Sequence, residues 1–214
     1  MDHSPPGPHA PLKLVAPIDN ARFTNSSFLQ ENILLIDFGQ SFPFLSPPTD
    51  YEPATALEYM SPEAHFEGRI GPPADVWALA CTIFQIRAGS PLFEAWLGGI
   101  DRVLKKIVAT LGKMPDPWWG AFENRHLWFD EDGNPKVPGS AKKTSIKQKL
   151  ASIGSQDMSR GIRDDGPMAE RPGTRLDEVE LEVLGDFLEK MLCYQPQDRI
   201  KMCEVVAHPW FALE

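Results

Sequence analysis

The sequence predicts a mainly α-helical domain with very little β-strand. Three long stretches carry apolar residues at helical spacing, namely residues 74–88, 100–111 and 177–192. One short run, residues 33–36, has the apolar composition of a strand. The length of 214 residues and an apolar fraction of 42% suit one domain with a sizeable core.

Proline and serine divide the N-terminal part of the chain into an arm, a strand and a loop. Residues 1–32 are expected to form an extended, poorly ordered arm, because proline fixes φ and removes a hydrogen-bond donor. Residues 33–36 predict a short strand that ends at Asp37, and residues 40–73 predict a long loop. A loop of that length inside a compact domain is usually functional or disordered. The prolines of the arm are Pro5, Pro6, Pro8, Pro11 and Pro17.

The helix predicted over residues 74–88 is the most apolar element of the chain. Asp75 suits its first turn and Gly89 suits its end. Its apolar residues lie all round the helix axis, which is typical of a helix at the centre of a core. They are Val76, Trp77, Leu79, Ala80, Ile83, Phe84 and Ile86.

The other predicted helices are amphipathic, so each is expected to bury one stripe. Residues 100–111 and 177–192 both show this pattern, and acidic residues at the start of the second suit its helix dipole. Residues 113–176 between them have weak periodicity and many Gly, Pro and Lys, which indicates an insertion. A short last helix is predicted near residues 201–207.

Composition and charge exclude several classes of function. A net charge of −9 and a pI near 5.1 argue against a nucleic-acid partner, which requires a basic face. The longest apolar stretch, "VWALACTIF", is too short to span a bilayer, so no membrane partner is expected. The N-terminus has no apolar signal-peptide core. Three widely spaced cysteines form no metal motif and fit a reducing compartment, so an intracellular location in the cytoplasm or nucleus is expected.

Four short motifs follow one another in a fixed order. Asp37-Phe38-Gly39 comes first, and Ser61-Pro62-Glu63 follows 24 residues later. Asp75-Val76-Trp77 begins 12 residues after Glu63, and Arg199 follows the last long helix. This series resembles the large, C-terminal lobe of a eukaryotic protein kinase, with its DFG motif, its APE motif, the start of its central helix and its late arginine.

Two longer phrases narrow the resemblance. "PPADVWALACTIFQIRAGSPLFEAW" and "LGKMPDPWW" are most similar to the SR-protein kinases and their fungal relatives, within the group that contains MAP and cyclin-dependent kinases. The resemblance covers residues 33–214, and the predicted insertion lies where that group carries one. Met60 departs from the Tyr-Arg pair usual in this group, which affects the expected substrate preference.

The resemblance implies a role for each residue of the first motif. Asp37 would chelate the Mg²⁺ that bridges the ATP phosphates, because a hard cation prefers carboxylate oxygen. Phe38 would pack under the site, and Gly39 would give the backbone room to reverse. ATP and Mg²⁺ are therefore the implied cofactors. The alternative for Asp37 is a plain turn residue at the end of a strand.

The later motifs would be structural. Glu63 would pair with Arg199, and Asp75 would accept backbone N–H groups of the catalytic loop. Trp77 would belong to the central helix. Residues 40–60 would be the activation segment, with Ala56–Met60 as the floor that receives substrate.

Several parts of a working kinase cannot be identified in these 214 residues. There is no G-x-G-x-x-G loop, and the residues before the predicted strand are too few for a small lobe with its paired lysine. Asp19 is the one candidate for the catalytic base. It lacks the His-Arg lead, and Ala21 and Thr24 stand where Lys and Asn are expected. Binding of ATP and phosphoryl transfer are therefore expected to be impaired.

The sequence thus predicts a protein serine/threonine kinase whose ancestral reaction is ATP-dependent phosphoryl transfer to Ser or Thr. Its expected partner is a protein, possibly a basic Arg/Ser-rich one. Two alternatives stay open: a kinase-derived docking module, in which the helical lobe is kept as an interaction surface, and a truncated gene product.

Overall fold

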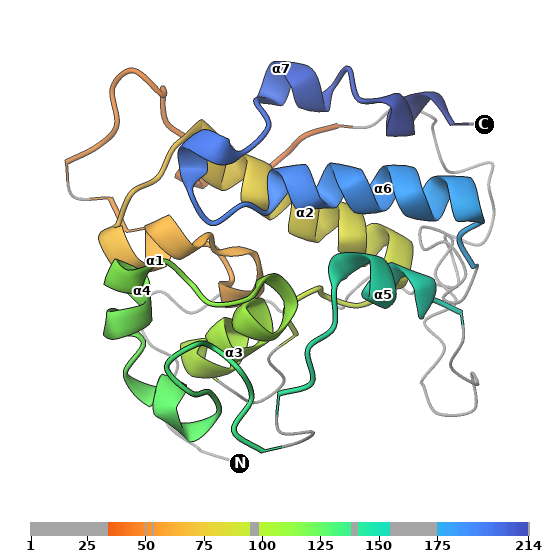
Figure 1. Cartoon of the computed structure of the whole chain (residues 1–214). Coiled ribbons are helices and arrows are strands. Elements are labelled where there is room, and N and C mark those ends of the chain that lie inside the picture. The colour runs from red at the N-terminus through yellow and green to blue at the C-terminus, as the bar shows by residue number, and fades with distance from the viewer. Residues whose placement is uncertain are drawn as a thin grey trace, which may run out of the picture.

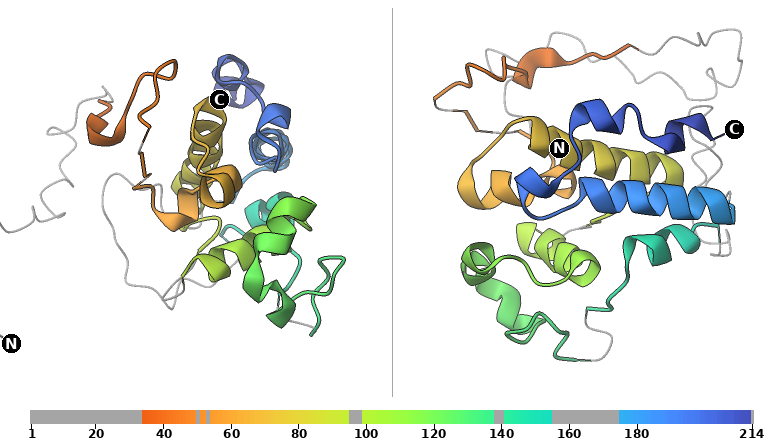
Figure 2. Two further views of the ribbon diagram at one scale, coloured as in Figure 1. Left: turned by 90° about the vertical axis from the view of Figure 1, so that its left-hand side faces the viewer. Right: turned by 45° about the horizontal axis from the view of Figure 1, so that its top comes forward.

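The computed structural model describes residues 34–49, 51–52, 54–94, 99–137, 141–154 and 175–213. Two long helices run side by side through the centre, α2 (Pro72–Ala88) and α6 (Glu178–Met191) (Figure 1). The short α7 (Met202–Val205) and a C-terminal 3₁₀ turn lie on one side of α6, as a second view confirms (Figure 2).

Four further helices complete the described fold on the other side of the central pair. They are α1 (Pro62–Glu67), α3 (Ile100–Leu111), α4 (Asp116–Ala121) and α5 (Ile146–Ala151). The α5 helix packs against α6, and α4 packs against α1. Short 3₁₀ turns connect these helices, at Phe38–Gln40, Leu57–Tyr59, Glu123–Leu127, Pro196–Asp198 and Pro209–Ala212.

The long predicted helices form close to their expected bounds. The α3 helix has the predicted bounds, and its buried stripe includes Val103, Leu104 and Ile107. The α2 helix begins at Pro72 rather than residue 74, because proline is well suited to the first helical positions, whose N–H groups have no intrahelical acceptor. The α6 helix begins after Asp177, whose carboxylate accepts the backbone N–H of Glu180 at 2.7 Å.

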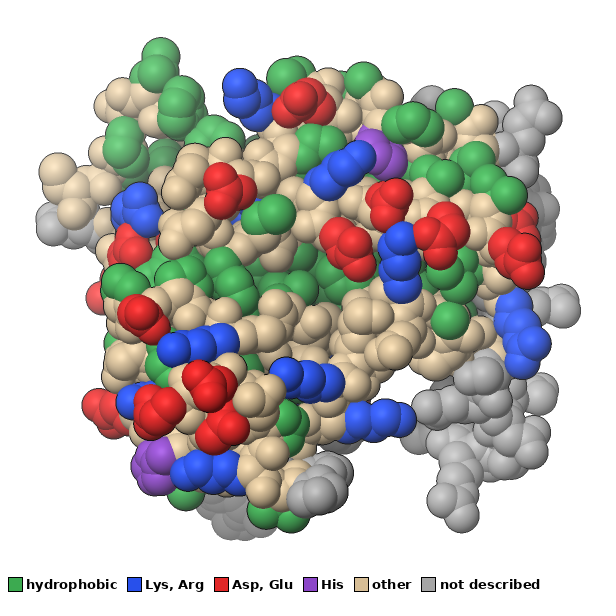
Figure 3. All heavy atoms as spheres, in the orientation of Figure 1, with side chains coloured by type: hydrophobic (Ala, Val, Ile, Leu, Met, Phe, Trp, Pro, Cys, Tyr) green, Lys and Arg blue, Asp and Glu red, His purple; other side chains and the backbone are tan. Residues whose placement is uncertain are grey.

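The central position of α2 is confirmed, but its predicted burial all round the axis is wrong in part. Trp77 is fully buried and Val76 is 2% exposed, whereas Leu79 is only partly buried and Ile86 is 66% exposed. A helix buries only the faces that other elements cover, and no described segment covers Ile86. Figure 3 shows hydrophobic side chains still visible in a band between α6 and α3.

Three other expectations need correction or adjustment. Residues 34–36 form no strand and are 80–81% exposed, since a strand requires a partner and the described residues provide none. The predicted loop 40–73 contains α1, because Pro62 starts a helix rather than breaking one. The described part of 113–176 contributes core residues through short helices that leave little periodicity. Those residues include Met114, Trp118, Trp119, Phe122, Phe129 and Leu150.

The contact between α5 and α6 depends on a glycine. The Lys147 side chain crosses α6 at Gly185, and its ammonium pairs with Glu182 at 2.6 Å and Asp186 at 2.8 Å. A Cβ on Gly185 would lie 2.6 Å from Cγ of Lys147, which is much closer than two carbons approach. The two ion pairs hold the lysine stem in place, so it cannot move aside freely.

We expect Gly185→Ala to lower the free energy of unfolding by about 1–2 kcal/mol, since overpacking outweighs the better helix propensity of alanine. Urea denaturation measures the change. The matched control is Gly120→Ala in α4, where a Cβ meets nothing within 4 Å. That substitution should raise the free energy of unfolding by about 0.5–1 kcal/mol. Equal effects in the two variants would contradict the predicted contact.

Among the described residues, no helix has the length and hydropathy needed to cross a membrane.

Candidate functional site

Asp37 has an unusual backbone conformation. Its φ of 67° makes it the one non-glycine residue of the described part of the chain with a positive φ. Such conformations are tolerated by Asp better than by most residues and are more frequent at functional sites. The side chain is exposed and has no hydrogen-bond partner among the described residues. No described residue therefore holds the Asp37 side chain.

The two residues after Asp37 differ from expectation. Phe38 is 64% exposed rather than packed under a site, because no described segment covers it. A Cβ on Gly39 would touch only Oδ1 of Asp37, at 3.7 Å, and Gly39 has no positive φ. The left-handed residue of the turn is therefore Asp37, and nothing described requires glycine at position 39.

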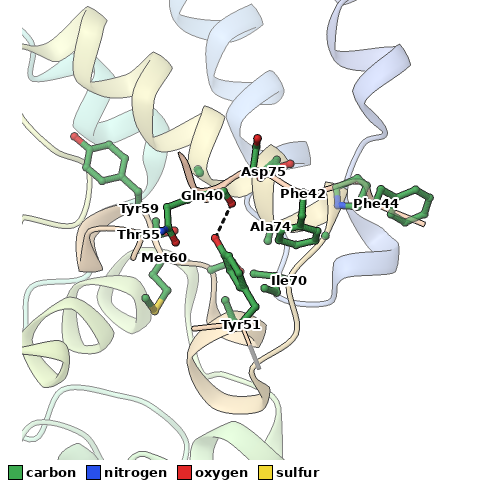
Figure 4. A pocket seen from close by; sticks show the side chains of 16 residues that line it. Gln40, Phe42, Phe44, Tyr51, Thr55, Tyr59, Met60, Ile70, Ala74 and Asp75 are labelled. Atoms are coloured by element: carbon green, nitrogen blue, oxygen red, sulfur yellow. Dashed lines mark hydrogen bonds between the residues drawn. The ribbon is translucent and has the colours of Figure 1, made fainter. Parts of the chain in front are cut away.

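The two arms of the predicted activation segment contact each other. The hydroxyl of Tyr51 donates to the backbone carbonyl of Gln40 at 2.9 Å (Figure 4). The rings of Phe42 and Tyr51 pack edge to face with centroids 4.9 Å apart. These contacts connect the start of the segment, just after Asp37, to its middle.

The floor of the predicted segment is attached to α2. Residues Leu57–Tyr59 form a 3₁₀ turn, and the hydroxyl of Tyr59 donates to Oε1 of Gln85. Burial raises the pKa of Tyr59, with smaller contributions from Cys81 and Glu58, so the phenol stays protonated as a donor. Gln85 was not predicted as a site residue. Its polar amide in a mostly apolar helix could have indicated a hydrogen-bond partner on a neighbouring segment.

A pocket of about 230 Å³ lies between the predicted activation segment and the start of α2. Gln40, Tyr51 and Met60 line one side, and Asp75 lines the other (Figure 4). Partial desolvation raises the pKa of Asp75, whose carboxylate makes no described hydrogen bond. The buried hydroxyl of Ser61 also lines this pocket without a described partner.

The expected pair between Glu63 and Arg199 is present and deeply buried. The guanidinium of Arg199 contacts both carboxylate oxygens of Glu63, at 2.6 and 2.7 Å, and the side chains are 1% and 3% exposed. Its other N–H groups donate to the backbone carbonyls of Pro73, Cys193 and Tyr194 at 2.8, 2.8 and 3.2 Å. All five donors of the guanidinium are therefore used.

Trp77 lies under this pair. The Arg199 guanidinium is 5.0 Å from the Trp77 ring centroid. Phe93 stacks on Trp77, with ring centroids 5.7 Å apart. The pair thus joins the first turn of α1 to the start of α2 and to the turn after α6. It fixes the end of the predicted activation segment on the helical core.

The expected catalytic candidate and its surroundings lie outside the described residues. Asp19 and residues 17–30, which would provide the partners of Asp75, are not described. Among the residues that are described, no group of three or more His, Cys, Asp or Glu side chains could hold a metal ion. Mg²⁺ with ATP is usually held by one or two carboxylates and the phosphates, so Asp37 fits as one such ligand.

A long segment that starts at an exposed aspartate and ends at a buried Glu–Arg pair packed against the start of the central helix is the arrangement of a protein kinase domain. A family model described as "Protein kinase domain" matches residues 24–211. The chain therefore belongs to the protein kinase domain family. Asp19 lies before the matched residues.

Three similar proteins come from three organisms, and two of them are named as kinases. The dual specificity tyrosine-phosphorylation-regulated kinase mbk-2 of Caenorhabditis elegans is 25% identical over 183 residues, covering 85% of this chain and 21% of that protein. Cell division control protein 2 homolog 1 of Trypanosoma brucei brucei is 24% identical over 188 residues, 86% of this chain and 54% of that protein. Dual specificity tyrosine-phosphorylation-regulated kinase 3 of Homo sapiens is 24% identical over 190 residues, 85% of this chain and 32% of that protein. The chain thus spans between 21% and 54% of the length of these relatives.

Proposed function

We propose that residues 33–214 provide the substrate-facing, large-lobe part of a serine/threonine protein kinase, with residues 1–32 as an arm. The observation that carries this proposal is the tethering of residues 40–60 between two fixed points. Tyr51 and Gln40 join its arms, and the Glu63–Arg199 pair fixes its end. A segment held in this way presents a surface to a polypeptide substrate while leaving Asp37 exposed for the Mg²⁺ of a nucleotide.

The substrate in this proposal is a protein with basic Arg/Ser-rich sequence, as the SR-protein-kinase phrases imply. The side chains on the floor support only part of this preference. Met60 is apolar where the resembled group usually has arginine. The Asp75 carboxylate, which has no partner among the described residues, lines the adjoining pocket. An intracellular location is part of the same proposal, and the free thiols of Cys81, Cys193 and Cys203 support it. No observation favours the docking-module alternative over this one.

Binding of the substrate tests the proposal directly. An Arg/Ser-rich peptide added to the 214-residue protein should slow amide hydrogen exchange in residues 40–60, because a bound peptide covers that backbone. The same peptide with alanine in place of arginine serves as the matched control and should leave the exchange unchanged. Equal exchange with and without the Arg/Ser-rich peptide would refute the proposed substrate surface.

We further propose that the polypeptide of residues 1–214 is catalytically impaired when tested by itself. Its sequence holds no glycine-rich phosphate loop and no catalytic-loop motif, and Asp37 is the one nucleotide-side ligand described. Purified protein should transfer no labelled phosphate from ATP to an Arg/Ser-rich peptide above background. Transfer that disappears in Asp37→Ala would contradict the impairment and would establish Asp37 as the metal ligand.

A further inference from the structure

The outer face of α3 collects positive charge in an otherwise acidic protein. Arg102 and Lys106 are exposed one turn apart on that face, and Lys105 lies between them. Lys149 of α5 lies near enough for the charge of Lys106 to act on it. These four side chains are here called the basic face. The basic face carries four positive charges, whereas the whole chain has a net charge of −9.

The cations of the basic face have no described carboxylate as an ion-pair partner. The ion pairs of the described residues involve Arg69, Arg87, Lys113, Arg125, Lys147 and Arg199. The Lys105 ammonium instead lies 5.1 Å from the ring centroid of Trp128, and Lys149 donates to the carbonyl of Leu92 at 3.4 Å. The two lysines are therefore held in place by an aromatic and a backbone contact, and no described carboxylate forms an ion pair with them.

Two acidic groups lie near the basic face, Asp101 and Glu94, but neither forms an ion pair with its cations among the described residues. Asp101 on α3 accepts a hydrogen bond from Asn124 at 2.6 Å. Glu94 raises the pKa of Lys149 only in part, because burial and the charge of Lys106 lower it to below its ordinary value overall. The pKa of Lys105 is likewise lowered, by burial first and then by Lys106 and Arg102. An anion at the basic face would relieve this repulsion.

The acidic face of a second copy is a poor candidate for that anion. Three of the five carboxylates on α6 are already paired within the chain, Glu180 with Arg87 and both Glu182 and Asp186 with Lys147. The undescribed segment 155–174 is no better, since its four acidic residues are interleaved with three arginines. Neither source offers a free run of carboxylates, which favours a different molecule as the counter-charge.

We propose that the basic face of α3 and α5 is a docking surface for a carboxylate-rich segment of a partner protein. The face lies on the opposite side of α2 and α6 from α7 (Figure 1). None of its four cations lines the pocket next to Asp75. The α3 helix also contacts the 3₁₀ turn Leu57–Tyr59, so the basic face and the proposed substrate surface are neighbours. The interaction is electrostatic, so it weakens as ionic strength rises.

The test uses the 214-residue protein and a fluorescein-labelled peptide of alternating Glu and Ser, followed by fluorescence anisotropy. We expect saturable binding at low salt that falls about tenfold in the Arg102→Gln/Lys106→Gln variant. The matched control is Arg175→Gln/Lys201→Gln, which removes one Arg and one Lys from exposed positions on other elements and should bind as the wild type does. Thermal melts should be unchanged in both variants, because all four side chains are exposed.

Three outcomes would overturn this proposal. The first is no saturable binding of the Glu/Ser peptide, and the second is an equal loss of affinity in the two double variants. The third is competition by polyuridylic acid at an equal concentration of charge, which would assign the face to nucleic acid. None of these readouts involves residues 40–60 or phosphoryl transfer, so they are independent of the proposed kinase function.

Discussion

Replacing Arg199 with alanine is expected to lower the free energy of unfolding by about 3–5 kcal/mol. The substitution leaves the Glu63 carboxylate 3% exposed and without its cation, together with three backbone carbonyls that lose their donors. It also removes the cation from the face of Trp77. An unpaired buried charge is the most costly part of this change, and urea denaturation monitored by tryptophan fluorescence measures the sum.

Two controls test whether the loss in Arg199→Ala comes from the unpaired buried charge. Arg69 pairs with Glu67 at the surface, with the arginine side chain 60% exposed, so Arg69→Ala should cost less than about 1 kcal/mol. The double variant Glu63→Leu/Arg199→Met removes both charges and should recover part of the stability lost in Arg199→Ala. A single variant as stable as the wild type would show that the pair does not hold the segment in solution.

The parts of the fold that could be predicted from the sequence are those with a local physical cause. The bounds of α3 follow from a stripe of apolar residues and a glycine stop, and those of α6 from a stripe and the Asp177 cap. Residues 34–36 form no strand, because a strand depends on a partner elsewhere in the chain and the described residues provide none. The prediction that Ile86 is buried was wrong for a similar reason, because the exposure of a side chain depends on which segment covers that face of the helix.

In the candidate site too, some contacts could be predicted from the sequence and others could not. The Glu63–Arg199 pair joins residues 136 apart, and only the resemblance to kinases predicted it. Contacts such as Tyr59 with Gln85 have no motif, because they depend on how the segment lies across α2. Similarly, the indole of Trp118, inside the predicted insertion, donates to Glu67 of α1 at 2.6 Å, a contact that no motif predicts.

The second large effect is expected at Phe84, which lies in α2 and is 5% exposed within the core. Phe84→Ala should lower the free energy of unfolding by about 3–5 kcal/mol, through lost burial and the cavity that remains. Ile86→Ala is the control on the same helix. Its side chain is 66% exposed, so its truncation should cost less than about 1 kcal/mol. Similar losses for the two variants would show that α2 is not the central helix.

Asp75 lies on α2 as Phe84 does, but its substitution is expected to affect stability differently. Its pKa in the folded protein is raised by desolvation, so the folded state favours the protonated carboxyl. Ionised Asp75 therefore opposes folding, and this effect is absent at low pH. It develops as pH rises from the ordinary aspartate pKa through the raised pKa, and is constant above. Asp75→Asn should thus cost nothing at neutral pH, and its stability relative to the wild type should increase across that window.

The opposite result at Asp75 would change the view of the whole chain. A carboxylate that accepted backbone N–H groups from residues 17–30 would have its charged form stabilised, and Asp75→Asn would then cost stability above the carboxyl pKa. A large loss in Asp75→Asn, comparable with that of Phe84→Ala, would indicate that residues 17–30 rebuild the equivalent of a catalytic loop. Asp19 would then lie beside the start of α2, and the proposed impairment of the 214-residue protein would have to be abandoned.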